Sequence, residues 1–305
     1  MKRNSRFYAA LGLISLIYVL LSLSSPVADS ARNFNATTFQ FRAIQISVII
    51  PVIIIWSVAL WGSLKFKRYA QNIIESQDGQ ALHSVANGLI ALVFGLALNS
   101  MIQAVQPLLR GSSYFNEWVI FANYLELAVV LVSFYMIYRG ALKLVSLVQF
   151  KGFARAQAGV ILALVGLGTL YAWLLAMNPY RQASPDITRI VPLYLPDWLI
   201  VVSIIVPYLL AWYMGLMAAM SILLYQRNAP GIIYRRSARH LSFGMLAIAT
   251  SSVLLQMLSA IGPSLSHLGL NSILLILYLL IIAYGFGHIM VAYGAKQLAK
   301  LEEAV

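Results

Sequence analysis

Hydrophobic residues in this chain come in long blocks separated by short polar segments. A helix needs about 20 mainly apolar residues to cross a hydrocarbon core roughly 30 Å thick. Runs such as Ile273–Ala283 lack the alternation of membrane-barrel strands, so the blocks predict helices. We place eight transmembrane helices at about 7–25, 43–65, 83–105, 117–139, 157–177, 199–224, 241–262 and 270–293.

The first block, 7–25, has a second interpretation as a secretory signal. It follows a basic start, and small residues near Ser24 to Ala28 could form a cleavage site. The apolar stretch is long for a signal core and close to full spanning length. A retained anchor is therefore the preferred interpretation.

Composition excludes a water-soluble fold. Of 305 residues, 61% are hydrophobic and 10% are charged, whereas soluble domains have roughly 45–50% and about 25%. The net charge of +12 comes from basic residues in short loops between the spans. We therefore expect anionic lipid headgroups as partners at the inner face, and no nucleic acid. The absence of cysteine excludes disulfides, thiol catalysis and cysteine-ligated metals.

Lys and Arg predict the orientation, because basic loops are retained on the cytoplasmic side. With the amino terminus inside, sixteen of the 21 Lys and Arg residues fall in inner segments. The other five are Arg32, Arg42, Arg110, Arg181 and Arg189. We expect an integral protein of a bacterial cytoplasmic membrane with both termini in the cytoplasm.

The sequence repeats itself at an offset of 156 residues. Residues 46–56 match residues 202–212, sharing Ser, Ile, Pro and Trp in the same register. Between 46 and 107 the register holds without a gap, with 13 identities in 62 positions. Further matches, such as Gly140 with Gly294, continue at an offset of 154.

The repeat predicts an all-α fold of two tandem four-helix units. The units are 1–147 and 156–305, joined by a cytoplasmic linker at 148–155. Because four is even, both units have the same orientation, as in parallel transporter repeats. The linker could lie on the inner headgroups as an amphipathic helix or simply continue the fourth span.

Glu126, about nine residues into the fourth span, is the first candidate site, because an ionisable group near the bilayer centre is costly. Asn123 shares its stripe of the helix. The third span carries Asn99 and Gln103 on a small and polar face with four-residue spacing, together with Asn87, Ala91 and Gly95. Asn99 lies at a depth that permits contact with Glu126.

These four residues have two interpretations. Glu126, Asn123, Asn99 and Gln103 could form an intramembrane binding site for a proton, a cation or a polar headgroup. Alternatively, a protonated Glu126 simply hydrogen-bonds neighbouring helices. At the aligned positions the second unit has Leu280, Leu277, Leu255 and Ser259. Any site therefore belongs to the first unit or to the seam between the units.

No pattern in the chain predicts catalysis, a metal or a cofactor. His288 follows Gly285 and Gly287 in the last span, and no second histidine shares its span, so a structural role is preferred over a haem ligand. Only nine acidic residues exist, and most fall in loops or tails. Phosphate loops and nucleophile elbows are absent, so we expect no enzyme.

Two function classes remain. One is a transporter, channel or small-solute-binding membrane protein with its polar site around Glu126. The other is a non-catalytic helical bundle that associates with itself or scaffolds other membrane subunits. The polar cluster favours the first class, and the scarcity of charge inside the spans favours the second.

Overall fold

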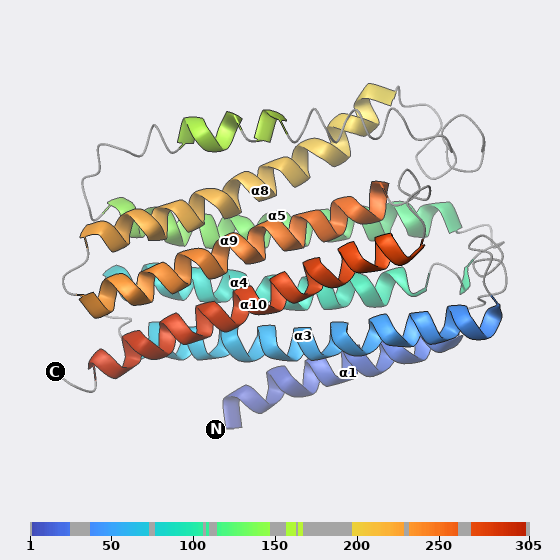
Figure 1. Cartoon of the computed structure of the whole chain (residues 1–305), viewed down its shortest axis with the longest axis horizontal. Helices are drawn as coiled ribbons and strands as arrows, with labels where there is room; N and C mark the ends of the chain where they lie inside the picture. The colour runs from blue at the N-terminus through green and yellow to red at the C-terminus, as the bar shows by residue number, and fades with distance from the viewer. Residues whose placement is uncertain are drawn as a thin grey trace.

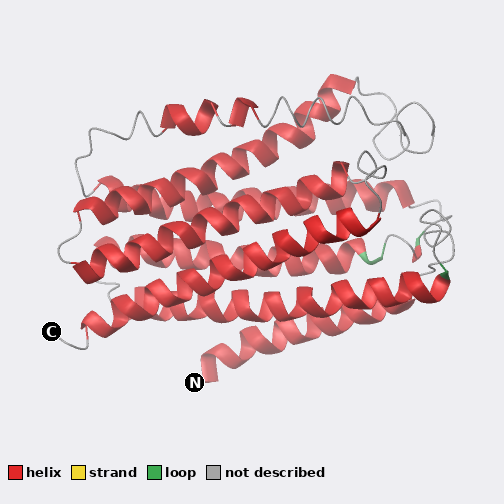
Figure 2. Ribbon diagram, viewed as in Figure 1, coloured by secondary structure: helices red, strands yellow, loops and turns green. Residues whose placement is uncertain are grey.

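The computed structural model describes residues 2–24, 37–72, 77–105, 108–109, 115–146, 157–162, 164–166, 197–228, 232–261 and 270–302. This part of the chain is almost entirely helical and contains no strand (Figure 2). Its long helices are α1 (Lys2–Ser24), α3 (Thr38–Asn72), α4 (Gln77–Gln103), α5 (Phe115–Ser146), α8 (Asp197–Asn228), α9 (Ile232–Ile261) and α10 (Leu270–Glu302). All seven are long and apolar enough to cross a membrane. The chain is thus, by length and composition, a polytopic membrane protein.

The seven helices confirm seven of the eight predicted spans. The remaining span, predicted at 157–177, is helical at 157–162 and 164–166, and the rest of it lies outside the described residues. Gln157 Nε2 donates a hydrogen bond of 2.8 Å to Tyr213 Oη, which attaches this short helix to α8. The last residues of α5 and the first residues of α8 lie at opposite ends of the bundle (Figure 1).

Several helices continue beyond the predicted boundaries. α3 extends to Asn72 instead of residue 65, and α10 extends to Glu302 instead of residue 293. The prediction followed hydrophobicity and therefore stopped where charged residues begin. Backbone hydrogen bonding does not stop there, because long basic side chains can reach the headgroups while the helix continues.

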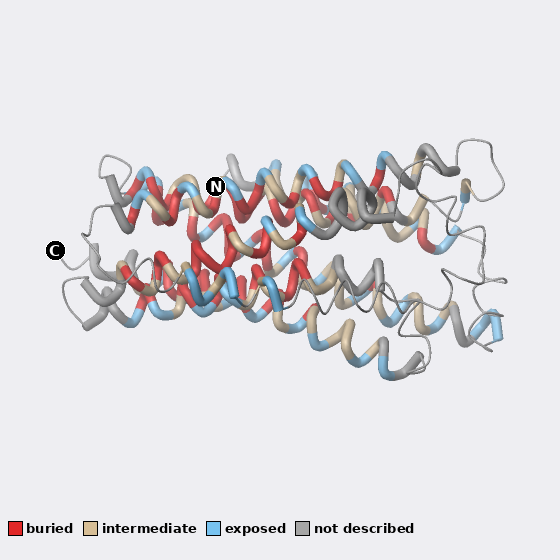
Figure 3. Tube along the Cα trace, turned by 90° about the horizontal axis from the view of Figure 1, so that it is seen from above, coloured by how far each residue is buried: buried red, intermediate tan, exposed pale blue. Residues whose placement is uncertain are grey.

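Six helices form a closed ring, in which α3, α4, α5, α8, α9 and α10 pack in this order and α10 returns to α3. α1 lies outside the ring, against α3 and α4. Seen from above, the helices form two layers, and buried positions gather where the layers face each other (Figure 3). The large side chains buried there include Leu60, Phe66, Phe134 and Met217.

Glycines bring α4 and α5 into backbone contact. A β-carbon added to Gly88 would lie 2.8 Å from the Ser133 carbonyl oxygen, and one added to Gly140 would lie 2.6 Å from the Ala81 carbonyl oxygen. Such distances are too short for any residue larger than glycine without a shift of the backbone. Small residues of this kind let membrane helices approach closely enough for dense van der Waals packing.

We predict that Gly88→Ala destabilises the protein because the added methyl group meets backbone atoms of α5. Overpacking of this kind costs about 1–3 kcal/mol. The measurement is the midpoint of thermal unfolding of the purified protein in detergent. Gly12→Ala is the control, since a β-carbon at Gly12 has nothing within 4 Å. Equal midpoints for the two variants would contradict the proposed role of the glycine contact.

Candidate functional site

Glu126 is buried in the bundle and turned away from the surrounding lipid. Its side chain is 7% exposed, whereas the exposed apolar residues of α5 include Phe121, Tyr124, Val132 and Tyr135. At about 100° per residue these four positions share one face of the helix, and Glu126 falls on the opposite face. The carboxyl group therefore faces protein, which disfavours binding of a lipid headgroup.

Asn99 meets Glu126 because α4 and α5 are already close at this point. Gly95 on α4 packs directly against the side chain of Val129 on α5. Asn99 lies four residues after Gly95 and Glu126 lies three residues before Val129, and the two helices are antiparallel. One helical turn farther along the same interface, the amide of Asn99 and the carboxyl group of Glu126 therefore face each other.

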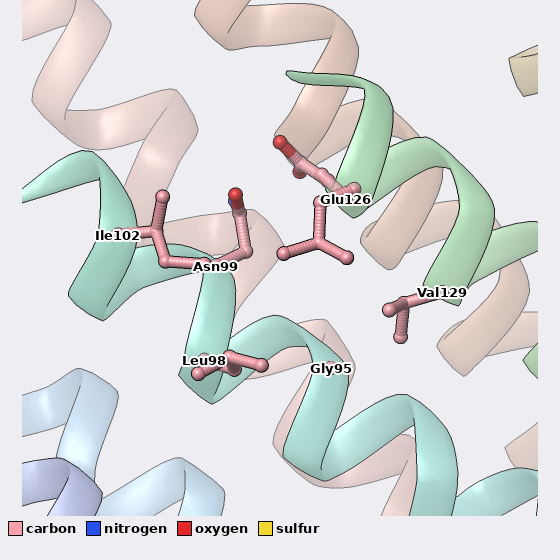
Figure 4. Close-up of a pocket in the computed structure, with 7 residues that line it drawn as sticks. Gly95, Leu98, Asn99, Ile102, Glu126 and Val129 are labelled. Atoms are coloured by element: carbon pink, nitrogen blue, oxygen red, sulfur yellow. The ribbon is translucent and has the colours of Figure 1, made fainter. Parts of the chain in front are cut away.

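Asn99 lies close enough to Glu126 to interact with its carboxyl group, with the side-chain amide as the hydrogen-bond donor. Their polar ends point to the same side of the helix pair (Figure 4). The Oδ1 atom of Asn99 is buried and has no hydrogen-bond partner among the described residues. Farther along, Trp118 Nε1 donates to the carbonyl oxygen of Ile102 at 3.3 Å and ties α5 to α4 again.

A small pocket lies beside this pair. It is lined by Gly95, Leu98, Asn99, Ile102, Leu125, Glu126 and Val129. Its unfilled space is about 160 Å³ including the open side, and no part of it is wide enough for the centre of a water-sized sphere. An organic solute does not fit there without movement of the helices.

The chemistry of this pocket is that of one acid in apolar surroundings. Glu126 is the one ionisable group among the seven residues that line it, and its hydrogen-bond partner is a neutral amide. A carboxylate removed from water without an opposite charge is strongly destabilised. The neutral, protonated form of Glu126 therefore suits this pocket better than the charged form.

The structure brings together two of the four residues of the predicted cluster. Asn123 lies on α5 and Gln103 on α4, but their side chains are outside the part of the chain that the structure describes. On α4, Gly95 packs on Val129 of α5, and Asn87, Ala91 and Asn99 are all half-buried.

His288 belongs to a second buried polar cluster, at the interface between α10 and α3. It is completely buried, and its Nδ1 atom is 3.4 Å from Ser63 Oγ. The ring of Tyr284 stands edge-on to it, with centroids 4.7 Å apart. Within the described residues, no group of three His, Cys, Asp or Glu side chains could hold a metal ion. Patterns within one helix do not predict the contact with Ser63, because the two residues are 225 positions apart.

No protein-family model matches the chain, and comparisons with curated proteins and with solved structures find no significant match.

We predict that Asn99 and Glu126 are energetically coupled. Asn99→Leu alone and Glu126→Leu alone each leave a buried polar group without its partner, which costs about 1–3 kcal/mol. The double variant removes both groups and introduces the leucines found at the aligned positions of the second unit, so it should lose less stability than the two single losses combined. Unfolding midpoints of the four proteins give the coupling, and strictly additive losses would show that the pair does not interact.

Proposed function

We propose that this protein is a carrier- or channel-like membrane protein that binds and releases a proton at Glu126. The observation that carries the proposal is the buried carboxyl group with a neutral amide as its hydrogen-bond partner. Ionisable residues inside membranes are expensive and mark ion pathways and proton relays. The proposal includes no catalytic activity.

The size of the pocket favours a proton over any larger species. The space beside Glu126 is too narrow for a water molecule, so a hydrated cation or an organic solute would require the lining side chains to move. A proton adds no volume. Asn99 remains a hydrogen-bond donor to the carboxyl group, and its buried Oδ1 can accept a hydrogen bond from the protonated acid.

We also propose that the chain consists of two like-oriented four-helix units, each of which contributes three helices to the ring. Equivalent glycines support this repeat. A β-carbon on Gly244 would lie 2.6 Å from the Gly287 carbonyl oxygen, as one on Gly88 would approach the Ser133 carbonyl oxygen. Positions 244 and 287 correspond to 88 and 133 at offsets of 156 and 154. The α9–α10 interface thus resembles the α4–α5 interface in its close contacts.

Under the proposed repeat, only the first unit contains the residues of the proton site. Glu126 and Asn99 correspond to Leu280 and Leu255, which cannot bind a proton. A second candidate, a scaffold for other membrane subunits, is favoured by the close glycine contacts and by the narrow pocket. The two functions differ in whether substitution of Glu126 changes anything besides stability.

The test of the proposed function is proton flux into proteoliposomes that contain a pH-sensitive dye. A potassium gradient with valinomycin supplies the driving potential. We predict flux above that of empty vesicles for the natural protein and for Glu117→Gln, and loss of this flux for Glu126→Gln. Glu117→Gln is a matched control because it removes a carboxyl group from the same helix.

Two results would contradict the proton function. One is flux that is equal in Glu126→Gln and in the natural protein, and the other is no flux from any of the proteins. Either result, with unfolding midpoints unchanged, would favour the scaffold.

We further propose that both termini are cytoplasmic and that anionic headgroups lie at that face. Arg68 on α3, Lys143 on α5 and Lys296 on α10 are exposed near helix ends on the side of the bundle that holds both termini (Figure 1). Basic residues are retained on the cytoplasmic side and attract acidic lipids.

The natural absence of cysteine makes this orientation directly testable. We predict that a membrane-impermeant maleimide labels Thr37→Cys in intact cells or spheroplasts. Lys143→Cys should react only after the membrane is permeabilised. Labelling in the reverse order would contradict the orientation.

A further inference from the structure

Two helix–helix interfaces, here called seams, join the proposed four-helix units. α5 of the first unit packs on α8 of the second, and α10 of the second packs on α3 of the first. The repeat, on which this inference rests, relates α5 to α10 and α3 to α8. The seams are therefore equivalent by position, and two identical units would make them identical.

At the seam between α5 and α8, an aromatic ring fits against a glycine. Phe134 is 1% exposed, and a β-carbon added to Gly215 would lie 2.8 Å from its Cε1 atom and 2.5 Å from Ala249 Cβ on α9. The residue of α3 that corresponds to Gly215 is Ala59, which carries the methyl group that this ring excludes. Phe134 therefore does not fit the same position on α3.

At the seam between α10 and α3, an imidazole takes the place of that ring. His288 corresponds to Phe134, and its Nδ1 atom pairs with Ser63. A β-carbon added to Gly62 would lie 2.7 Å from the His288 carbonyl oxygen. The corresponding residues of α8 are Ala218 and Ala219, which add a methyl group at the first position and remove the hydroxyl group at the second.

We propose that Phe134 and His288 determine which helices pair, so that each unit accepts the other unit and rejects a copy of itself. A pair of first units would press Phe134 of each copy onto Ala59 of the other. A pair of second units would leave His288 without Ser63 and bring Ala218 against its backbone. Partner choice of this kind depends as much on penalties in the wrong pair as on contacts in the right one.

The pairing of a first unit with a second unit determines how many copies of the polar site a ring contains. Glu126 and Asn99 belong to the first unit only, so a ring made of unlike units contains one buried Glu126. Pairing of like units would give either two acids or none.

The test is an exchange of side chains in the full-length chain. Phe134→His combined with His288→Phe should lower the unfolding midpoint by roughly 5–10 °C, because both seams then carry the wrong side chain. Exchanging the receiving positions as well should restore most of the loss. These further changes are Ala59→Gly, Ser63→Ala, Ala218→Gly and Ala219→Ser. Gly62 and Gly215 stay unchanged, because methyl groups there would meet the backbone carbonyl oxygen of residue 288 and the side chain of Ala249.

The control exchanges the neighbouring equivalent pair, Tyr135→Ile with Ile289→Tyr. Both residues are about half exposed, at 52% and 48%, so this exchange should leave the midpoint unchanged. Tolerance of the Phe134 and His288 exchange, or a further loss when the receiving positions are exchanged, would overturn the proposal. The readout is stability and not proton flux, so failure here is distinct from failure of the Glu126 function.

A milder set of variants tests the same point if the multiple exchange does not fold. Phe134→Leu should recover part of the stability lost on Gly215→Ala, because the shorter side chain relieves the contact with the aromatic ring. The contact with Ala249 remains and limits the recovery. Phe134→Leu should recover none of the stability lost on Gly62→Ala, which meets His288 instead. Equal recovery of the two variants would overturn the pairing rule.

Discussion

Close backbone contact between helices is the constraint on which this bundle depends. In lipid, apolar side chains gain little by leaving their surroundings, so association rests on van der Waals packing and interhelical hydrogen bonds. Gly88 and Gly140 supply that packing between α4 and α5, and Gly244 and Gly294 supply it between α9 and α10. A side chain at any of these four positions would separate two helices of the ring.

The polar site is a consequence of the same packing. Because Gly95 holds α4 against Val129, the next pair along the interface, Asn99 and Glu126, comes within hydrogen-bonding distance and has little space around it. In the proposed function, this tight packing favours a proton, which neutralises the acid without adding volume. The α9–α10 interface has similar close glycine contacts, and the aligned positions there carry leucine in place of both polar residues.

Much of this fold follows from one property of the sequence, the length of its apolar blocks. Helix ends were misplaced where charged residues continue a helix, as at Asn72 and Glu302. The close contacts of α4 with α5 recur every seven residues, at Ala81, Gly88 and Gly95, whereas a four-residue spacing drifts around the helix by about 40° at each step. The approach of Ser63 to His288 could not be predicted, since spacing within one helix does not identify the helix that packs on it.

Infrared difference spectroscopy across a pH change observes the carboxyl group of Glu126 itself. If Glu126 binds and releases a proton, a protonated-carboxyl C=O band gains or loses intensity with pH in the natural protein and in Glu117→Gln, and this band is missing from Glu126→Gln. A natural protein whose spectrum shows no pH-dependent band from Glu126 would overturn the proton function. This result would mean that the acid serves only as a hydrogen-bonded link between α4 and α5.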